Sequence, residues 1–295
     1  MIATMSLQQN GNCLSIPLKI PVDAVATRVT QMIKYFDKRN NRVICVENAA
    51  TPAFWDAHWD SDRLRSEIVG SQASWIVRKT KAFLPLQSRV LEGGCGLGNQ
   101  VLALMRGGYQ AVGVDFAVNT VEYLQRERPE IDIRLGDVRD LPFPAGEFDG
   151  YWSLGVIEHF WGGYDKIAEE MARVLRKGGY LFLTFPTMSF IRKEKAKRGK
   201  YRPWDGADVE PDGFYQYILD PTDVVKRFQS LGFQLAGKSV YDGLKGCKDE
   251  VSFMAHPLQL LYDSPLLFAK ALRRALEMVL LGGFGHMQLL VLRKQ

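Results

Sequence analysis

Cysteine is scarce in this sequence, with four residues among 295. The four stand far apart, without the paired spacing of a zinc site or the density of a disulfide scaffold, so we expect reduced thiols and no metal centre. An apolar run of about 18 residues, long enough to cross a bilayer, is also lacking. Residues 1–10 show no basic segment followed by an apolar core. These absences predict a cytoplasmic protein without a transmembrane helix.

An excess of one charge is likewise lacking over most of the chain. The net charge is +5, and residues 187–203 alone carry seven Lys or Arg against one Glu. A nearly neutral chain with one basic segment argues against general nucleic-acid binding and favours a local contact with an anion. Arg192, Lys193 and Arg198 are the candidates to pair with a phosphate, a uronate or another anionic group on a substrate.

What the sequence does have is a glycine-rich loop between an apolar strand and a helix. Val90 and Leu91 lead into Glu92, and Gly94, Gly96 and Gly98 then occupy alternate positions. Glycine tolerates positive φ and lets the backbone approach a ligand closely. The spacing differs from the G-x-G-x-x-G pattern of dinucleotide-binding proteins. An acid before the loop would repel a pyrophosphate and attract an ammonium group.

Short apolar strands and helices alternate along residues 89–186, which predicts a parallel, doubly wound sheet. In such sheets ligands bind beyond the carboxyl ends of the strands. Glu92, Asp115, Asp137 and Ser153 each fall at such an end. Asp115, at the end of the second strand, is placed to accept hydrogen bonds from the hydroxyls of a ribose.

Four segments, in the same order, resemble the motifs of the class I S-adenosylmethionine (SAM)-dependent methyltransferases. They are Glu92–Gly98, Val112–Ala117, Gly136–Asp149 and Arg173–Leu181. The resemblance covers roughly residues 75–240 and neither end of the chain. It implies an α/β fold with a Rossmann-like, doubly wound, seven-stranded sheet. Strands one to five would be parallel and strand seven antiparallel, with helical insertions between strands.

The resemblance also implies SAM as the cofactor, S-adenosylhomocysteine as the product, and no metal. Asp137 would take the adenine amino group, and Ser153 and Leu154 would line the methionine side. The full implied cofactor set is Glu92, Gly93, Gly94, Gly96, Gly98, Asp115, Phe116, Asp137, Val138, Ser153 and Leu154.

Residues on the acceptor side are less marked in the sequence. His159 is the candidate general base, with a structural role as the alternative, because the Glu158-His159 pair is common across the family. The aromatic segment Thr51–Asp62 contributes Trp55 and His58 as candidate substrate contacts, with plain helix packing as the alternative. Arg192, Tyr215 and Tyr217, in the insertion after the fifth strand, complete the candidate substrate set; a solvated loop is the alternative there.

The two ends of the chain suggest additions to this domain. We expect residues 1–70 to form an N-terminal helical cap region, with Val22–Phe36 as an amphipathic helix. Residues 71–295 would form the SAM-binding domain, with insertions at about 187–217 and 249–284. The helix expected at Pro265–Leu281 confines its charges to a narrow stripe. Its wide apolar face would suit core packing, a homodimer, a lid, or peripheral contact with a membrane or a lipid-linked substrate.

The hypothesis that follows is methyl transfer from SAM to a small-molecule or glycan acceptor, with oxygen as the accepting atom. An Asn-Pro-Pro-Tyr type motif is lacking after the fourth strand, which disfavours amino methylation of bases or glutamine. The alternatives are a lipid or quinone methyltransferase, a non-catalytic partner protein with this fold, and an NAD-dependent reductase.

Overall fold

The computed structural model describes residues 32–47, 49–59 and 71–295. These residues belong to one compact unit, Met32–Gln295. No helix in the described ranges is both long and apolar enough to cross a membrane.

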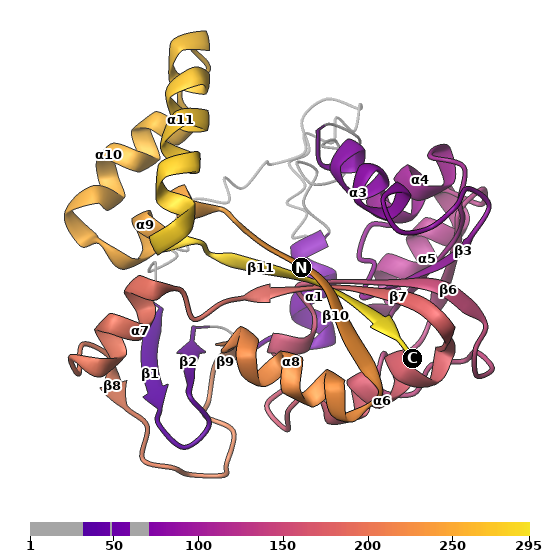
Figure 1. Ribbon diagram of the computed structural model, residues 1–295, viewed down its shortest axis with the longest axis horizontal. Coiled ribbons are helices and arrows are strands. Elements are labelled where there is room, and N and C mark those ends of the chain that lie inside the picture. Colours follow the sequence, from indigo (N-terminus) through magenta and orange to yellow (C-terminus); the bar gives the residue numbers. More distant parts are fainter. Residues whose placement is uncertain (1–31, 48, 60–70) are drawn as a thin grey trace, which may run out of the picture. The chain divides into compact units, whose positions relative to one another are not determined.

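A seven-stranded sheet forms the centre of this unit, in the order β10-β11-β7-β6-β3-β4-β5 (Figure 1). Strands β3 to β7 pair in parallel, β11 runs antiparallel to β7, and β10 runs antiparallel to β11. The predicted fold class is therefore confirmed. The strands are β3 (Arg89–Gly93), β4 (Gln110–Asp115), β5 (Asp132–Leu135), β6 (Phe148–Leu154), β7 (Leu175–Pro186), β10 (Phe233–Tyr241) and β11 (Met287–Lys294).

Helices cover both faces of this sheet, as Figure 1 shows. Successive side chains of a strand point to opposite faces, so Val90 and Leu91 of β3 belong to two different hydrophobic cores. One core includes residues of α3 (Ser71–Lys81), α4 (Asn99–Arg106) and α5 (Val118–Glu127). The other includes residues of α6 (Asp165–Val174) and α8 (Pro221–Ser230).

A second, four-stranded sheet has the order β8-β1-β2-β9. It combines the hairpin β1 (Ile33–Asp37) and β2 (Arg42–Val46) with β8 (Arg202–Pro203) and β9 (Phe214–Ile218) from the insertion after β7. The helix expected at Val22–Phe36 is therefore wrong for Ile33–Phe36, and its remainder up to residue 31 lies outside the described residues. Strand pairing with two partners outweighs the helical periodicity, and Asn41 closes the hairpin with a φ of 48°.

Three short elements frame the carboxyl edge of the large sheet. They are α1 (Pro52–Trp59), the 3-10 turn η1 (Ile157–His159) and α7 (Phe190–Lys197). Asp56 fixes α1 to α5, because its Oδ1 accepts hydrogen bonds from the Thr120 amide and hydroxyl, both at 3.0 Å. Between β10 and β11 the chain forms α9 (Gly243–Glu250), α10 (Ser252–Asp263) and α11 (Leu267–Phe284), and α11 projects away from the sheet in Figure 1.

Candidate functional site

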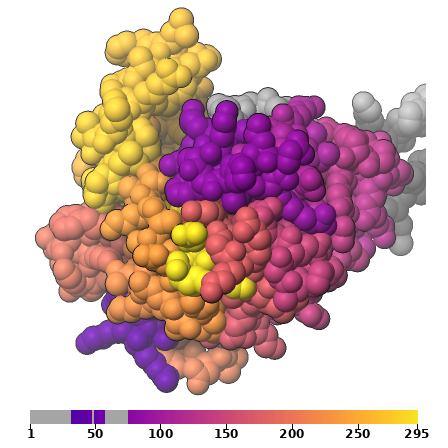
Figure 2. Space-filling view, turned by 45° about the vertical axis from the view of Figure 1, so that its right-hand side comes forward, coloured from indigo at the N-terminus to yellow at the C-terminus, as the bar shows by residue number. Residues whose placement is uncertain are grey.

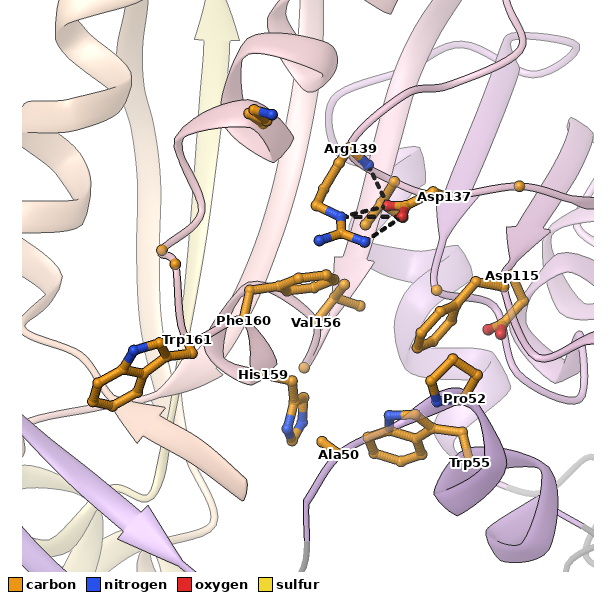
Figure 3. Close-up of a pocket in the computed structure, with 18 of the residues that line it drawn as sticks. Ala50, Pro52, Trp55, Asp115, Asp137, Arg139, Val156, His159, Phe160 and Trp161 are labelled. Atoms are coloured by element: carbon orange, nitrogen blue, oxygen red, sulfur yellow. Dashed lines mark hydrogen bonds and ion pairs between the residues drawn. The ribbon is translucent and has the colours of Figure 1, made fainter. Parts of the chain in front are cut away.

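A cavity of about 800 Å³ opens at the carboxyl ends of β4, β5 and β6. Its walls include Asp115 from β4, Asp137 after β5, Leu154 at the end of β6, and Gly155 and Val156 directly after it. Trp161, His159 of η1 and Trp55 of α1 lie along one side, with His159 in the middle, and Asp137 and Arg139 lie on the other (Figure 3). The doubly wound sheet therefore brings Asp115 and Asp137, two of the four predicted strand-end residues, to one cavity at the edge where ligands bind in such folds.

The glycine loop and Asp115 hold each other in place. The Gly96 amide donates to Asp115 Oδ2 at 2.8 Å, and the Ala117 amide donates to Oδ1 at 2.9 Å. Of the predicted loop glycines only Gly94 lines the cavity, with a φ of 74°. A Cβ on Gly94 would lie 2.5 Å from Val156 Cγ2. The loop backbone is thus in close contact with the cavity wall, which explains the need for glycine at this position.

The other predicted loop glycines serve the fold around the site rather than its wall. A Cβ on Gly93 would lie 2.0 Å from the Tyr151 hydroxyl oxygen. Gly98, with a φ of 66°, is the N-cap of α4. Cys95, between them, is buried, and its burial holds the thiol pKa well above its usual range, so it behaves as a packed neutral side chain.

Two buried polar groups beside the loop have hydrogen-bonding capacity to spare. Glu92 Oε2 and Ser153 Oγ have no hydrogen-bond partner among the described residues. Burial, followed by the nearby Asp115 charge, raises the pKa of Glu92 well above its usual value. Burial also raises the pKa of Asp115. A cation beside these two acids would relieve both effects. Neither Glu92 nor Ser153 lines the 800 Å³ cavity.

Asp137 lines the cavity in a tight pair with Arg139, which sequence analysis missed. Arg139 Nη2 lies 2.6 Å from Asp137 Oδ2, and Arg139 Nε lies 3.0 Å from both carboxylate oxygens (Figure 3). These hydrogen bonds hold the pKa of Asp137 below its usual value. The Arg139 guanidinium also lies 5.1 Å from the centre of the Phe160 ring. A ligand that reaches Asp137 therefore meets a paired carboxylate. Val138, Phe116 and Leu154, also predicted, line the same cavity.

His159 lies at the centre of an aromatic cluster drawn from three distant segments. Its ring is 5.1 Å from both Trp55 and Tyr215, edge-on in each case. His159 Nδ1 lies 2.7 Å from the Tyr215 carbonyl oxygen, which can only accept, so Nδ1 carries the proton and Nε2 a lone pair. Burial lowers the pKa of His159 to about 4, and the imidazole is therefore neutral at pH 7.

A second cavity, of about 390 Å³, shares Gly155 and His159 with the first. Glu158 lines it, although only 2% of this residue is exposed. Within the described part of the chain Glu158 Oε2 has no hydrogen-bond partner, and burial raises the pKa of this carboxyl to about 8. Tyr215 lines the second cavity too. Sequence analysis passed over Glu158 because a carboxylate is distinguished as a proton acceptor only by burial and by the cavity it faces.

Arg192 is not at either cavity. It is 1% exposed, and its Nε lies 3.0 Å from Glu250 Oε1 while its Nη2 lies 2.8 Å from His286 Nδ1. Lys34 and Lys195 pair with the same Glu250, each at 2.7 Å. The expected substrate contact of Arg192 is not supported, because the folded chain already satisfies this guanidinium.

Tyr217 and His58 were also predicted to contact the substrate. Tyr217 is buried and donates its hydroxyl hydrogen to the Trp161 carbonyl at 2.9 Å, while its ring stacks on Trp161. It therefore supports the cavity wall from behind. His58 lies in α1, but its side chain lies outside the described residues. In the described ranges, no three His, Cys, Asp or Glu residues are grouped so that they could hold a metal ion.

Comparison with known proteins indicates the family of this domain. Residues 91–183 match a family model described as a methyltransferase domain. The "Probable S-adenosylmethionine-dependent methyltransferase" of Mycolicibacterium smegmatis is 28% identical over 166 residues, which cover 55% of this chain and 60% of that protein. A fatty-acid O-methyltransferase of the same organism is 35% identical over 100 residues, or 32% of this chain and 36% of that protein. The matched segment thus spans less than two thirds of either relative.

Among solved structures, the cyclase SpnF shares the fold with a TM-score of 0.54 and 18% sequence identity. The match covers 84% of this chain and 98% of SpnF. At this level of identity the likeness establishes the architecture alone.

Proposed function

We propose that this chain, which belongs to the class I SAM-dependent methyltransferases, binds SAM in the 800 Å³ cavity and methylates an oxygen of an acceptor held beside His159. The observation that carries the proposal is the Glu92–Gly98 loop, locked to Asp115 at the edge of the sheet. The cyclase SpnF shares this fold, so the fold alone does not establish methyl transfer.

The residues present fit this cofactor. Asp115 is anchored by two backbone amides, and each carboxylate oxygen retains acceptor capacity for a ribose hydroxyl. Asp137 and Val138 would face the adenine. Glu92 and Ser153 lie behind the cavity wall, and the buried Glu92 carboxyl with its unpaired oxygen would attract the ammonium end of the methionine moiety by its charge and not by direct contact. The net positive charge of such a ligand would offset the mutual repulsion of the Glu92 and Asp115 carboxylates. When bound, SAM supplies a methyl group activated by its attachment to a positively charged sulfur.

The chain's own residues would orient the acceptor and receive its proton. A hydroxyl is a weak nucleophile, so oxygen methylation calls for a nearby base. His159 Nε2 and the Glu158 carboxylate are the two candidates, and both residues line the smaller cavity. Burial lowers the pKa of His159 to about 4 and raises that of Glu158 to about 8, so the Glu158 carboxylate is the stronger base. With this pKa Glu158 is mostly protonated at pH 7, and it accepts a proton only in the ionised fraction, which rises as the pH approaches 8. We assign proton acceptance to Glu158 and hydrogen bonding of the acceptor to His159.

A lipid-like acceptor is the second candidate. The fatty-acid O-methyltransferase among the relatives supports an acceptor of this class. The aromatic side chains of Trp55 and Tyr215 beside His159 would suit an apolar acceptor chain. We expect no general binding to nucleic acid.

Calorimetric titration with SAM, S-adenosylhomocysteine and NADH tests the proposal. The wild type should bind the two sulfur nucleosides and not NADH. Asp115→Ala should weaken SAM binding by more than about tenfold, because a hydrogen bond to a charged group contributes roughly 1.5–3 kcal/mol.

Asp132→Ala is the matched control, because Asp132 is an exposed acid on β5, the strand next to β4, and pairs with Arg134 of the same strand. Its SAM affinity should equal that of the wild type. Absence of SAM binding in the wild type, or binding that Asp115→Ala leaves unchanged, would contradict the assignment of the cavity.

A further inference from the structure

The outward face of α11 is apolar and uncovered in the described part of the chain. Leu267, Met278 and Val279 are 82%, 72% and 78% exposed. Phe268 and Leu272 are exposed on the same side of the helix, because these five positions span less than half of the helical circumference. Soluble proteins rarely expose an apolar surface of this kind without a partner. Figure 2 shows α10 and α11, in gold, standing out beyond the neighbouring elements.

The opposite face of α11 already serves the fold. Leu276 and Leu280 pack against Leu244, Cys247 and Leu258 in a small core shared with α9 and α10. Core packing, one of the alternatives expected from the sequence, thus explains only the inner side of the helix. The apolar residues of the outer face are not needed for this packing.

Basic residues border the outer face. Lys270 and Arg274 are exposed, one helical turn apart, along one edge of the five apolar residues. The one acid of α11, Glu277, is turned inward and accepts hydrogen bonds from the Gly243 and Leu244 amides at 2.6 and 3.0 Å. Positive charge at the rim of an apolar helix face complements an anionic lipid surface.

We propose that α11 is a membrane-docking helix, whose residues Leu267, Phe268, Leu272, Met278 and Val279 enter the interface of a bilayer containing anionic phospholipid. Lys270 and Arg274 then face the headgroups. The helix lies in the plane of the interface and does not cross the membrane.

The position of this helix also bears on the acceptor, and this step rests on the proposed function. α9, which packs against α11, contributes Lys245 to the 390 Å³ cavity. His286 and Met287, which follow α11 in the chain, line the same cavity. Docking through α11 would hold the second cavity close to the bilayer, where an amphiphilic acceptor resides.

Vesicle co-sedimentation of the full chain tests the docking surface. The probes are vesicles of phosphatidylcholine alone and of phosphatidylcholine mixed equally with phosphatidylglycerol. The wild type should sediment with the mixed vesicles. The triple variant Leu267→Ser, Met278→Ser, Val279→Ser should lose binding by at least about tenfold, since the burial of each apolar side chain in the bilayer interface favours binding. Lys270→Gln with Arg274→Gln should weaken binding to the mixed vesicles by about fivefold or more.

Two control variants distinguish docking through α11 from nonspecific adsorption to vesicles. Leu86→Ser removes an exposed apolar side chain elsewhere, and Lys226→Gln removes an exposed charge on α8; both should bind as the wild type does. Equal sedimentation of the triple variant and the wild type would overturn the proposal. So would a wild-type dimer in light scattering that the triple variant converts to monomer, because a second copy would then cover this face. SAM affinity, measured without vesicles, should be unchanged in every variant, so failure of docking and failure of cofactor binding are read separately.

Discussion

Arg192, Glu250, His286, Lys34 and Lys195 form a largely buried charged group that we call the Arg192 cluster. It leads to the sharpest prediction, because loss of Arg192 should lower stability if its role is structural and should weaken acceptor binding if it contacts the substrate. Arg192→Met removes the hydrogen bonds from the guanidinium to Glu250, to the Thr187 carbonyl at 2.8 Å and to His286. Breaking a buried ion pair from one side costs about 3–5 kcal/mol when the other charge is left alone, and Glu250 keeps Lys34 and Lys195, so we expect the lower value of about 3 kcal/mol. For a domain of this size that corresponds to a melting temperature lowered by roughly 6–12 °C. Thermal unfolding followed by circular dichroism measures the shift.

Arg198→Met is the matched control for this substitution. Arg198 follows α7, and its side chain is 72% exposed, with only a 3.6 Å contact to Glu194. Its removal should change the free energy of unfolding by no more than about 0.5 kcal/mol. An Arg192→Met protein that melts with the wild type but needs more acceptor for half-maximal rate would refute the structural reading and restore the substrate role.

The same cluster predicts how stability depends on pH. Burial would raise the pKa of Glu250, but the charges of Lys34 and Arg192 lower it to about 2. Burial and the Arg192 charge lower the pKa of His286 to about 2. Both folded-state values lie below the ordinary ones, 4.5 and 6.5, so the unfolded chain binds more protons. Stability should therefore fall as pH drops from about 6.5. In Arg192→Met that fall should be shallower, as measured by urea unfolding at several pH values.

Three further predictions concern the site. Gly94→Ala should abolish SAM binding in calorimetry while the protein stays folded, because the added Cβ meets Val156 at 2.5 Å and the positive φ disfavours alanine; retained affinity would show that the loop does not contact the ligand. Glu158→Gln should remove the rise in rate with an apparent pKa near 8 and leave SAM affinity intact; an unchanged pH profile would exclude Glu158 as proton acceptor. Asp56→Ala should release α1 and weaken SAM binding several-fold through displacement of Trp55, with Thr120→Val as the matched partner variant; equal affinities would show that α1 does not cover the ligand.

Much of the central sheet could be predicted from the sequence because its determinants are local. The helices Asn99–Arg106 and Val118–Glu127 and the strand Phe148–Leu154 have the bounds that periodicity and glycine or proline signals indicate. Glu92 and Asp115 could be placed at one edge because the carboxyl ends of parallel strands share an edge. These inferences need only the order of the elements.

The acceptor side could not be predicted, because it depends on pairings between segments far apart in the chain. The strand β2 near the N-terminus pairs with β9, and that pairing sets Tyr215 beside His159. Arg192 looked like part of a solvated basic loop until the fold placed it against Glu250, distant by 58 positions.

The sequence by itself therefore determined the fold class and the edge of the sheet at which the cofactor is expected to bind, because both follow from the glycine spacing and the order of the strands. Only the tertiary structure decided which charges are free to meet a ligand, because burial and long-range pairing govern whether a charge is already satisfied. The structural role of Arg192 and the roles proposed for Glu158 and for the outer face of α11 all follow from their surroundings in the fold, since no sequence motif indicates them.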